Sequence, residues 1–232
     1  MFSIEQIKGS RFPGKTLSLT FDDGPVESGV TAGAYGPSTL QLAEYLHKEG
    51  VPATFFMVGR FIAQYPAVMP EVVKLGHLIG NHTYNHPDMQ RLFEAGGDVR
   101  AEIRRTDDLI AHWTPGSTVY FRAPFGSWSP QLSATLNRDA NPHFNYAGPV
   151  HWDIECGDWA YWRDGRSAVE CAEAYWKEIK KVKRGIVLMH DSSADIDPAK
   201  TNNQTLETIK ILVPRLKRKG YRFVRLDAML SN

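Results

Sequence analysis

The chain has 232 residues, of which 42% are hydrophobic and 11% aromatic, and its 27 Lys and Arg residues balance 26 Asp and Glu residues. A chain of this length and apolar content can bury a substantial core without disulfides, and its composition excludes a disordered protein. A formal net charge of +1 gives no electrostatic argument for nucleic acid as a partner or for an anionic membrane surface.

We find neither a membrane span nor an export signal in the sequence. No apolar run approaches the ~18 residues that a span requires, so we expect a soluble protein. Residues Met1–Arg11 lack the basic start and the continuous apolar stretch of a secretory signal. The chain as written therefore predicts a cytoplasmic location, or an extracellular one if a leader has been removed. Cys156 and Cys171 are too few for a disulfide framework.

Short apolar runs rich in β-branched and aromatic residues recur along the chain and predict strands. They are Thr16–Phe21, Ala53–Val58, Leu78–Gly80, Thr118–Phe121, His151–Ile154, Ile186–Met189 and Tyr221–Val224. Helical periodicity lies between them, as in 40–50, 99–113 and 206–220, where Pro214 predicts a kink or an early helix end. This alternation predicts an α/β protein with parallel strands, and about seven strands favour a barrel over an open sheet. No linker divides the chain, so we expect one domain over residues 1–232.

The first predicted strand ends in two adjacent carboxylates, Asp22 and Asp23, followed by Gly24 and Pro25. Neighbouring side chains at a strand end point to different sides, so one carboxylate can bind a metal while the other faces a reactant. Asp-Asp-Gly-Pro is also a sequence typical of a turn, in which the carboxylates would have only a structural role. The segment alone leaves both interpretations open.

The third predicted strand is followed by two histidines four residues apart, His82 and His86. On one face of a helical turn, both imidazoles could reach one cation, and neutral imidazole is a good ligand for Zn²⁺ or Co²⁺. A purely structural pair is the alternative. Together with the two aspartates, however, the pair supplies two His and one carboxylate, a set that leaves coordination positions open for water and substrate.

Three later strand ends also carry polar residues that could do chemistry. Arg122 directly follows a strand, where a fixed guanidinium could hold a carboxylate ionised and oriented, although a surface arginine is the alternative. Residues 152–159 mix acids with tryptophans, which fits either a functional segment or an aromatic cluster with solvated acids. His190 ends a buried strand and is either a proton carrier near neutral pH or a structural histidine.

Five motifs in order, TFDDGP, HTYNHP, RAPFG, DIECGDW and LMHD, resemble those of the polysaccharide deacetylase family, the NodB-homology domain of carbohydrate esterase family 4. Each motif is weak alone, but the five stand in family order from Thr20 to Asp191, and the strand-helix pattern covers nearly the whole chain. The resemblance implies a distorted (β/α) barrel of about seven strands, which agrees with the strand prediction above.

The resemblance also implies a role for each motif residue. Asp22 would be the general base, and Arg122 would orient it. Asp23, His82 and His86 would bind a divalent metal ion, with Zn²⁺ as the first expectation and Co²⁺ or Ni²⁺ as alternatives.

The remaining motif residues would complete the active site. His190 would be the general acid, tuned from behind by Asp158. Trp159 and Leu188 would line the pocket for the acetyl methyl group, and the residue at the Phe125 position would offer its backbone N–H to the oxyanion.

Some features lie at or beyond the edge of the motifs. Aromatic side chains near Trp128 and Trp159 would stack on sugar rings, unless they only fill the loop layer. Phe125 replaces the usual tyrosine of its motif, and Glu155 stands where the fourth motif usually has its first Asp. The segment Val26–Pro37 is longer than the usual loop at this place and could reshape the substrate groove.

The function implied by the resemblance is metal-dependent removal of N-acetyl groups from N-acetylglucosamine units of an oligo- or polysaccharide, either chitin oligomers or peptidoglycan. Water activated by the metal would attack, with an Asp base and a His acid. The alternatives are an O-deacetylase of the same family, such as an acetylxylan esterase, and a non-catalytic carbohydrate-binding protein. The last should have lost Asp22 or His190, and both are present. The oligomeric state stays open.

Overall fold

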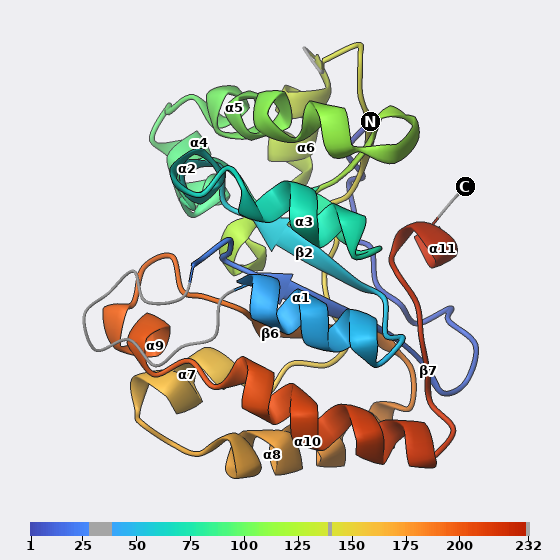
Figure 1. The fold of residues 1–232 in the computed structure, drawn as a ribbon. Coiled ribbons are helices and arrows are strands. Elements are labelled where there is room, and N and C mark those ends of the chain that lie inside the picture. The colour runs from blue at the N-terminus through green and yellow to red at the C-terminus, as the bar shows by residue number, and fades with distance from the viewer. Residues whose placement is uncertain (28–38, 139–140, 231–232) are drawn as a thin grey trace.

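The computed structural model describes residues 1–27, 39–138 and 141–230, with parallel strands at the centre and helices around them (Figure 1). The main sheet contains β1 (Thr16–Asp22), β2 (Ala53–Met57), β3 (Leu78–Asn81), β6 (Gly185–His190) and β7 (Arg222–Phe223). Its order is β3-β2-β1-β6, and β7 pairs with the start of β1. All these pairings are parallel. Every residue of β1 is buried, as expected for a strand covered on both faces.

A second, two-stranded sheet closes the ring. It contains β4 (Thr118–Tyr120) and β5 (Asn145–Ala147), again parallel. Asn81 pairs with Phe121 on one side of this sheet, and on the other side Ile154 pairs with Val187 of β6. The strands therefore form a distorted parallel barrel joined in places by single pairings, and the predicted α/β fold is confirmed.

Two strand predictions need correction. Residues His151–Ile154 form no strand of the described structure, and only Ile154 pairs with β6. Strand β5 was not predicted, because Asn145-Tyr146-Ala147 is short, begins with an exposed residue and contains no apolar run. Both corrections concern the irregular side of the barrel, where short pairings replace long strands.

Helices surround the barrel. They are α1 (Thr39–Lys48), α2 (Gly59–Gln64), α3 (Val68–Lys74), α4 (Met89–Glu94), α5 (Val99–Ile110), α6 (Pro130–Arg138), α7 (Asp158–Arg163), α8 (Ala168–Val182), α9 (Asp197–Thr201), α10 (Thr205–Arg218) and α11 (Asp227–Leu230). Helices α8 and α10 lie side by side below the sheet in Figure 1. Helix α10 continues past Pro214, so the predicted early end is wrong. The buried Val213 and Leu216 anchor this part of the helix and offset the hydrogen bond that proline removes.

The barrel interior is filled by apolar side chains from strands around the ring. This cluster contains Phe12, Phe56, Leu78, Tyr120, Val150, Ile186 and Leu226. This apolar layer lies beneath the polar residues at the carboxyl ends of the strands. No helix among the described residues is long and apolar enough to cross a bilayer. Of the predicted long loop Val26–Pro37, residues 28–37 lie outside the described structure.

Candidate active site

The carboxyl ends of the parallel strands bring the predicted polar residues to one edge of the barrel. Asp22, the last residue of β1, is in register with His190, the last residue of β6. Asn81 ends β3, and the chain continues directly into His82. This is the edge at which α/β barrels place their active sites.

A pocket of about 360 Å³ opens at this edge. Eight of the predicted site residues line it: Asp22, Asp23, His82, His86, Phe125, Trp159, Leu188 and His190. Arg122 and Asp158 are fully buried and contact the lining residues from behind. Trp128 is not among the lining residues.

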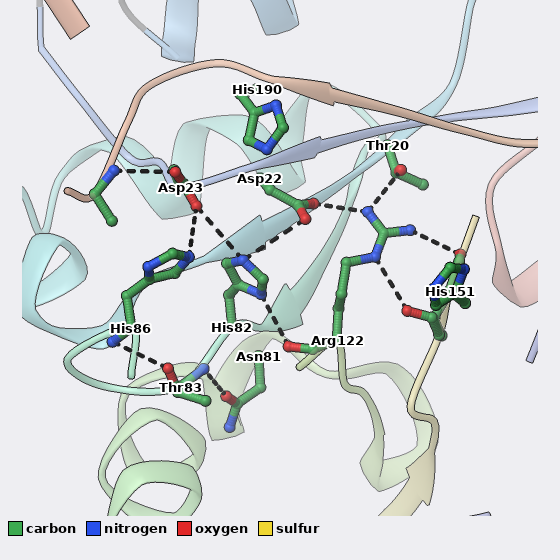
Figure 2. Close-up of polar contacts among 12 residues, drawn as sticks. Thr20, Asp22, Asp23, Asn81, His82, Thr83, His86, Arg122, His151 and His190 are labelled. Atoms are coloured by element: carbon green, nitrogen blue, oxygen red, sulfur yellow. Dashed lines mark hydrogen bonds and ion pairs between the residues drawn. The ribbon is translucent and has the colours of Figure 1, made fainter. Parts of the chain in front are cut away.

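Asp23, His82 and His86 converge on one point, as Figure 2 shows. Asp23 Oδ1 lies 3.1 Å from His86 Nε2 and 3.5 Å from His82 Nε2. The three ligand atoms lie within 4.8 Å of one another, and all three residues are buried. The arrangement offers two imidazole nitrogens and one carboxylate oxygen to a single cation.

The hydrogen bonds around this group fit a metal ion. His82 Nδ1 lies 2.8 Å from the carbonyl oxygen of Arg122, which can only accept, so Nδ1 carries the proton and Nε2 offers a lone pair. His86 Nδ1 likewise contacts Asp195 Oδ2 at 2.6 Å. Asp23 Oδ2 accepts from the backbone of Ala194 at 3.0 Å, whereas the buried Oδ1 has no hydrogen-bond partner among the described residues. The unused atoms of all three residues therefore face one another.

The charges around His86 also favour a cation at this point. Burial opposes charge on the imidazole, but the negative charge of Asp23 and the hydrogen bond that His86 donates to Asp195 outweigh it and raise the pKa of His86 to about 9. Asp195 was not predicted. Its position in the sequence could have indicated a role, because this carboxylate stands only five residues after His190, which was predicted as a site residue.

The two histidines reach the same point from a loop and not from a helical turn, which corrects the predicted local structure. Thr83 and His86 both have a positive φ, of 66° and 64°. The side chain of Asn81 accepts a hydrogen bond from Thr83 N at 2.7 Å, and Thr83 Oγ1 accepts one from His86 N at 3.1 Å. Polar side chains thus hold the loop in a conformation that non-glycine residues seldom adopt.

Arg122 is buried beneath Asp22, so the surface-arginine alternative is excluded. Its Nη1 donates to Asp22 Oδ1 at 2.7 Å and to Thr20 Oγ1 at 2.8 Å. Its Nε donates to the carbonyl of Val150 at 3.1 Å, and its guanidinium lies 4.2 Å from the ring centre of Phe56. One carboxylate oxygen of Asp22 is therefore fixed, while the other, Oδ2, lies 3.6 Å from His82 Nε2.

His190 is paired with Asp158 at the start of α7. The carboxylate contacts His190 Nδ1 at 2.7 Å and accepts from its backbone N–H at 2.7 Å. Burial opposes charge on His190, but the charge of Asp158 prevails and raises the pKa of His190 to about 10. With Nδ1 engaged, Nε2 is the nitrogen available to a substrate.

Aromatic side chains form the rim, although not all of those predicted. Phe125 is 64% exposed and its ring lies 4.9 Å from that of His86. Trp128 instead packs 5.7 Å from the ring of Phe121 and donates to the carbonyl of Ser3, so it fills the loop layer and its predicted role in sugar stacking is withdrawn.

Trp152, which was not predicted as a site residue, does line the pocket. Its ring stacks on that of His151 with centroids 4.0 Å apart. Sequence reasoning missed this tryptophan because it lies in the segment interpreted as a strand, where a large apolar side chain is expected to point into a core. The irregular backbone at this place presents the ring to the pocket instead.

Residues 9–141 match the sequence profile described as polysaccharide deacetylase. The chain belongs to this family of hydrolases. It is 31% identical over 214 residues to a chitooligosaccharide deacetylase of Azorhizobium caulinodans, which covers 89% of the chain and 90% of that relative. It is 28% identical over 220 residues to the peptidoglycan-N-acetylglucosamine deacetylase PgdA of Listeria monocytogenes, covering 93% of the chain and 39% of that protein.

Solved structures show the same fold. The crystal structure of the Bc1960 peptidoglycan N-acetylglucosamine deacetylase superimposes with a TM-score of 0.72 and 22% identity, covering 97% of this chain and 92% of that one. The agreement in fold supports the barrel described above.

Proposed function

We propose that this protein is a metal-dependent N-deacetylase that acts on N-acetylglucosamine units of chitin-type oligosaccharides. One observation carries the proposal: a single pocket brings together an Asp-His-His group, an aspartate fixed by a buried arginine, and a histidine paired with a buried carboxylate. The full-length similarity to a chitooligosaccharide deacetylase supports the substrate class. Peptidoglycan is the second candidate, because PgdA is similar over nearly the whole chain.

The proposed cofactor is Zn²⁺ bound by Asp23, His82 and His86, since two imidazoles and one carboxylate form a typical open zinc site. Co²⁺ and Ni²⁺ suit the same ligands. When bound, such a cation acidifies a water molecule and polarises the acetyl carbonyl. We take residues 1–232 as one catalytic domain, because Ile7 near one end and β7 near the other both pair with the barrel.

Asp22 would act as the general base. Arg122 holds its Oδ1, so that Oδ2 is presented on the side of the ligand group and can accept the proton of the attacking water. The backbone N–H of Phe125 would donate to the oxyanion that forms, an interaction often worth about 3 kcal/mol. Leu188 and Trp159 would enclose the acetyl methyl group.

His190 would act as the general acid. An amine is a poor leaving group until it is protonated, and His190 is held in its charged form by Asp158. The proton on His190 Nε2 would pass to the nitrogen as its bond to the acetyl carbon breaks. Acetate and a free amino sugar are the products.

Acetate release from three substrates, by protein loaded with Zn²⁺, tests the proposal. Chitin oligomers, peptidoglycan and acetylated xylan are compared, each with a chelator control. Release from chitin oligomers that stops on chelation and returns with Zn²⁺ is the expected result. Release from xylan alone would replace the proposal with O-deacetylation, and binding of chitin oligomers without any release would replace it with a carbohydrate-binding role.

A further inference from the structure

Cations gather at the end of the barrel where the strands begin, opposite the pocket. Three chain segments meet there: Lys15 N donates to the carbonyl of Lys183 at 3.0 Å, Lys15 Nζ donates to that of Lys219 at 2.8 Å, and Arg222 N donates to that of Lys15 at 2.8 Å. These contacts bring together the starts of β1, β6 and β7. We define the basic face as the exposed residues Lys15, Lys183, Arg184, Arg218, Lys219 and Arg222.

The positive charge of the basic face is not neutralised locally. None of its six residues forms an ion pair with another described residue, and Lys180, Lys181 and Lys217 in the last turns of α8 and α10 extend it. Of these three, Lys181 pairs with Glu178 and Lys217 with Glu49, at 3.2 and 3.0 Å. The overall net charge of +1 therefore does not describe the charge of this face.

The helix dipole does not explain the basic face. Cations are favourable in the last turn of a helix, which accounts for those at the ends of α8 and α10. Lys15, Arg184 and Arg222, however, lie outside the helices. Helix α5, with 12 residues, has no basic residue in its last turn. A helix of this fold therefore does not require cations at its C-terminal end. Hydrogen bonds from Lys15 Nζ to the carbonyl of Lys219 and from Arg184 Nη1 to the carbonyl of Phe12 explain where these two side chains lie, but they neutralise no charge. The accumulation of unpaired positive charge therefore needs another reason.

We propose that the basic face docks the protein on an anionic phospholipid bilayer. Separate, exposed Lys and Arg side chains suit a diffuse negative surface, to which each contributes roughly a fivefold gain in affinity. Of the aromatic side chains nearby, Phe12, Trp176 and Tyr221 are buried and Phe223 is half-buried, so this face presents no fully exposed ring among them on which single-stranded nucleic acid could stack. This inference is independent of the proposed reaction.

Docking on this face leaves the pocket accessible. The basic residues lie before the strands or, for Arg222, at the first strand residue, and the pocket lies at the carboxyl ends of the strands, roughly 20 Å away along the seven residues of β1. In Figure 1 the strands point away from the side on which α10 ends. A bilayer bound at the basic face would therefore not cover the pocket, which could still receive a carbohydrate chain.

Cosedimentation with vesicles tests the proposal, using the whole chain. One set of vesicles is phosphatidylcholine alone, and the other contains phosphatidylcholine and phosphatidylglycerol in equal parts. The protein should sediment with the anionic vesicles at low salt, stay in solution with the neutral ones, and be released at about 0.5 M NaCl, where the Debye length is only a few Å. No binding to the anionic vesicles, or equal binding to both, overturns the proposal.

Two variants with the same loss of charge localise the effect. The first carries Arg218→Gln and Arg222→Gln on the basic face, and the control carries Arg91→Gln and Arg138→Gln on α4 and α6, all exposed arginines. The first should bind anionic vesicles roughly twentyfold more weakly, and the control should bind as the unmodified chain does. Equal losses in both overturn the assignment to this face, as does tighter binding to a DNA duplex than to vesicles at the same salt. Acetate release from a soluble substrate should be unchanged in both variants.

Discussion

The floor and the rim of the pocket differ in how firmly they are fixed. On the floor, Arg122 is fully buried and contacts Asp22 at 2.7 Å, and His190 contacts Asp158 at the same distance. On the rim, Phe125 is 64% exposed. A buried charge that loses its partner strongly lowers the stability of the fold, so the floor residues have few acceptable replacements. An exposed ring can be replaced with little loss of stability. This comparison predicts that floor variants act mainly on kcat and rim variants mainly on KM.

Asp22→Asn should have the largest effect. The substitution keeps the size of the side chain but removes the base, so kcat should fall by about 10²- to 10⁴-fold while Zn²⁺ still binds. Acetate release and zinc content per chain measure the two effects separately. Asp164→Asn, an exposed residue beyond α7, is the matched control and should retain full activity. Retained turnover in Asp22→Asn would remove this residue from the role of base.

Asp158→Asn should change the pH dependence. In the unmodified chain Asp158 raises the pKa of His190 to about 10, so the histidine keeps its proton through neutral pH. Without that charge, burial lowers the pKa, and the acid form is lost at a lower pH. The alkaline limb of the kcat profile should therefore move to lower pH by more than one unit, and activity at pH 8 should fall more than activity at pH 6. An unmoved alkaline limb would mean that another group donates the proton.

Asp195→Asn should weaken metal binding without destroying the site. Asp195 contacts His86 Nδ1 at 2.6 Å, and loss of such a carboxylate typically costs 10- to 100-fold in metal affinity. Competition with a chelating dye measures the Zn²⁺ affinity directly. Asp197→Asn, two residues further along at the start of α9, is the control and should bind Zn²⁺ normally. Equal affinities in the two variants would show that Asp195 does not support His86.

The same contrast explains what could be predicted from the sequence. The strands β1, β2, β3 and β6 of the main sheet are almost entirely buried, so their positions and the polar residues at their carboxyl ends could be predicted directly, as for Asp22 and His190. The irregular side of the barrel could not be predicted in this way, because β5 and the single pairing at Ile154 depend on long-range contacts and leave no periodic pattern in the sequence. For that reason Trp152 was missed.

Trp152→Ala should have the smallest effect on the chemistry and the clearest effect on substrate binding. An aromatic contact of this kind is worth roughly 0.5–1.5 kcal/mol, so KM for chitin oligomers should rise about two- to tenfold while kcat changes little. Trp128→Ala is the informative comparison, since Trp128 packs on Phe121 and does not line the pocket. That variant should lower the melting temperature and leave KM unchanged. If Trp128→Ala raised KM and Trp152→Ala did not, the rim would lie on the other side of the pocket, and the loop after η3 (Pro124–Gly126) would carry the sugar contact instead.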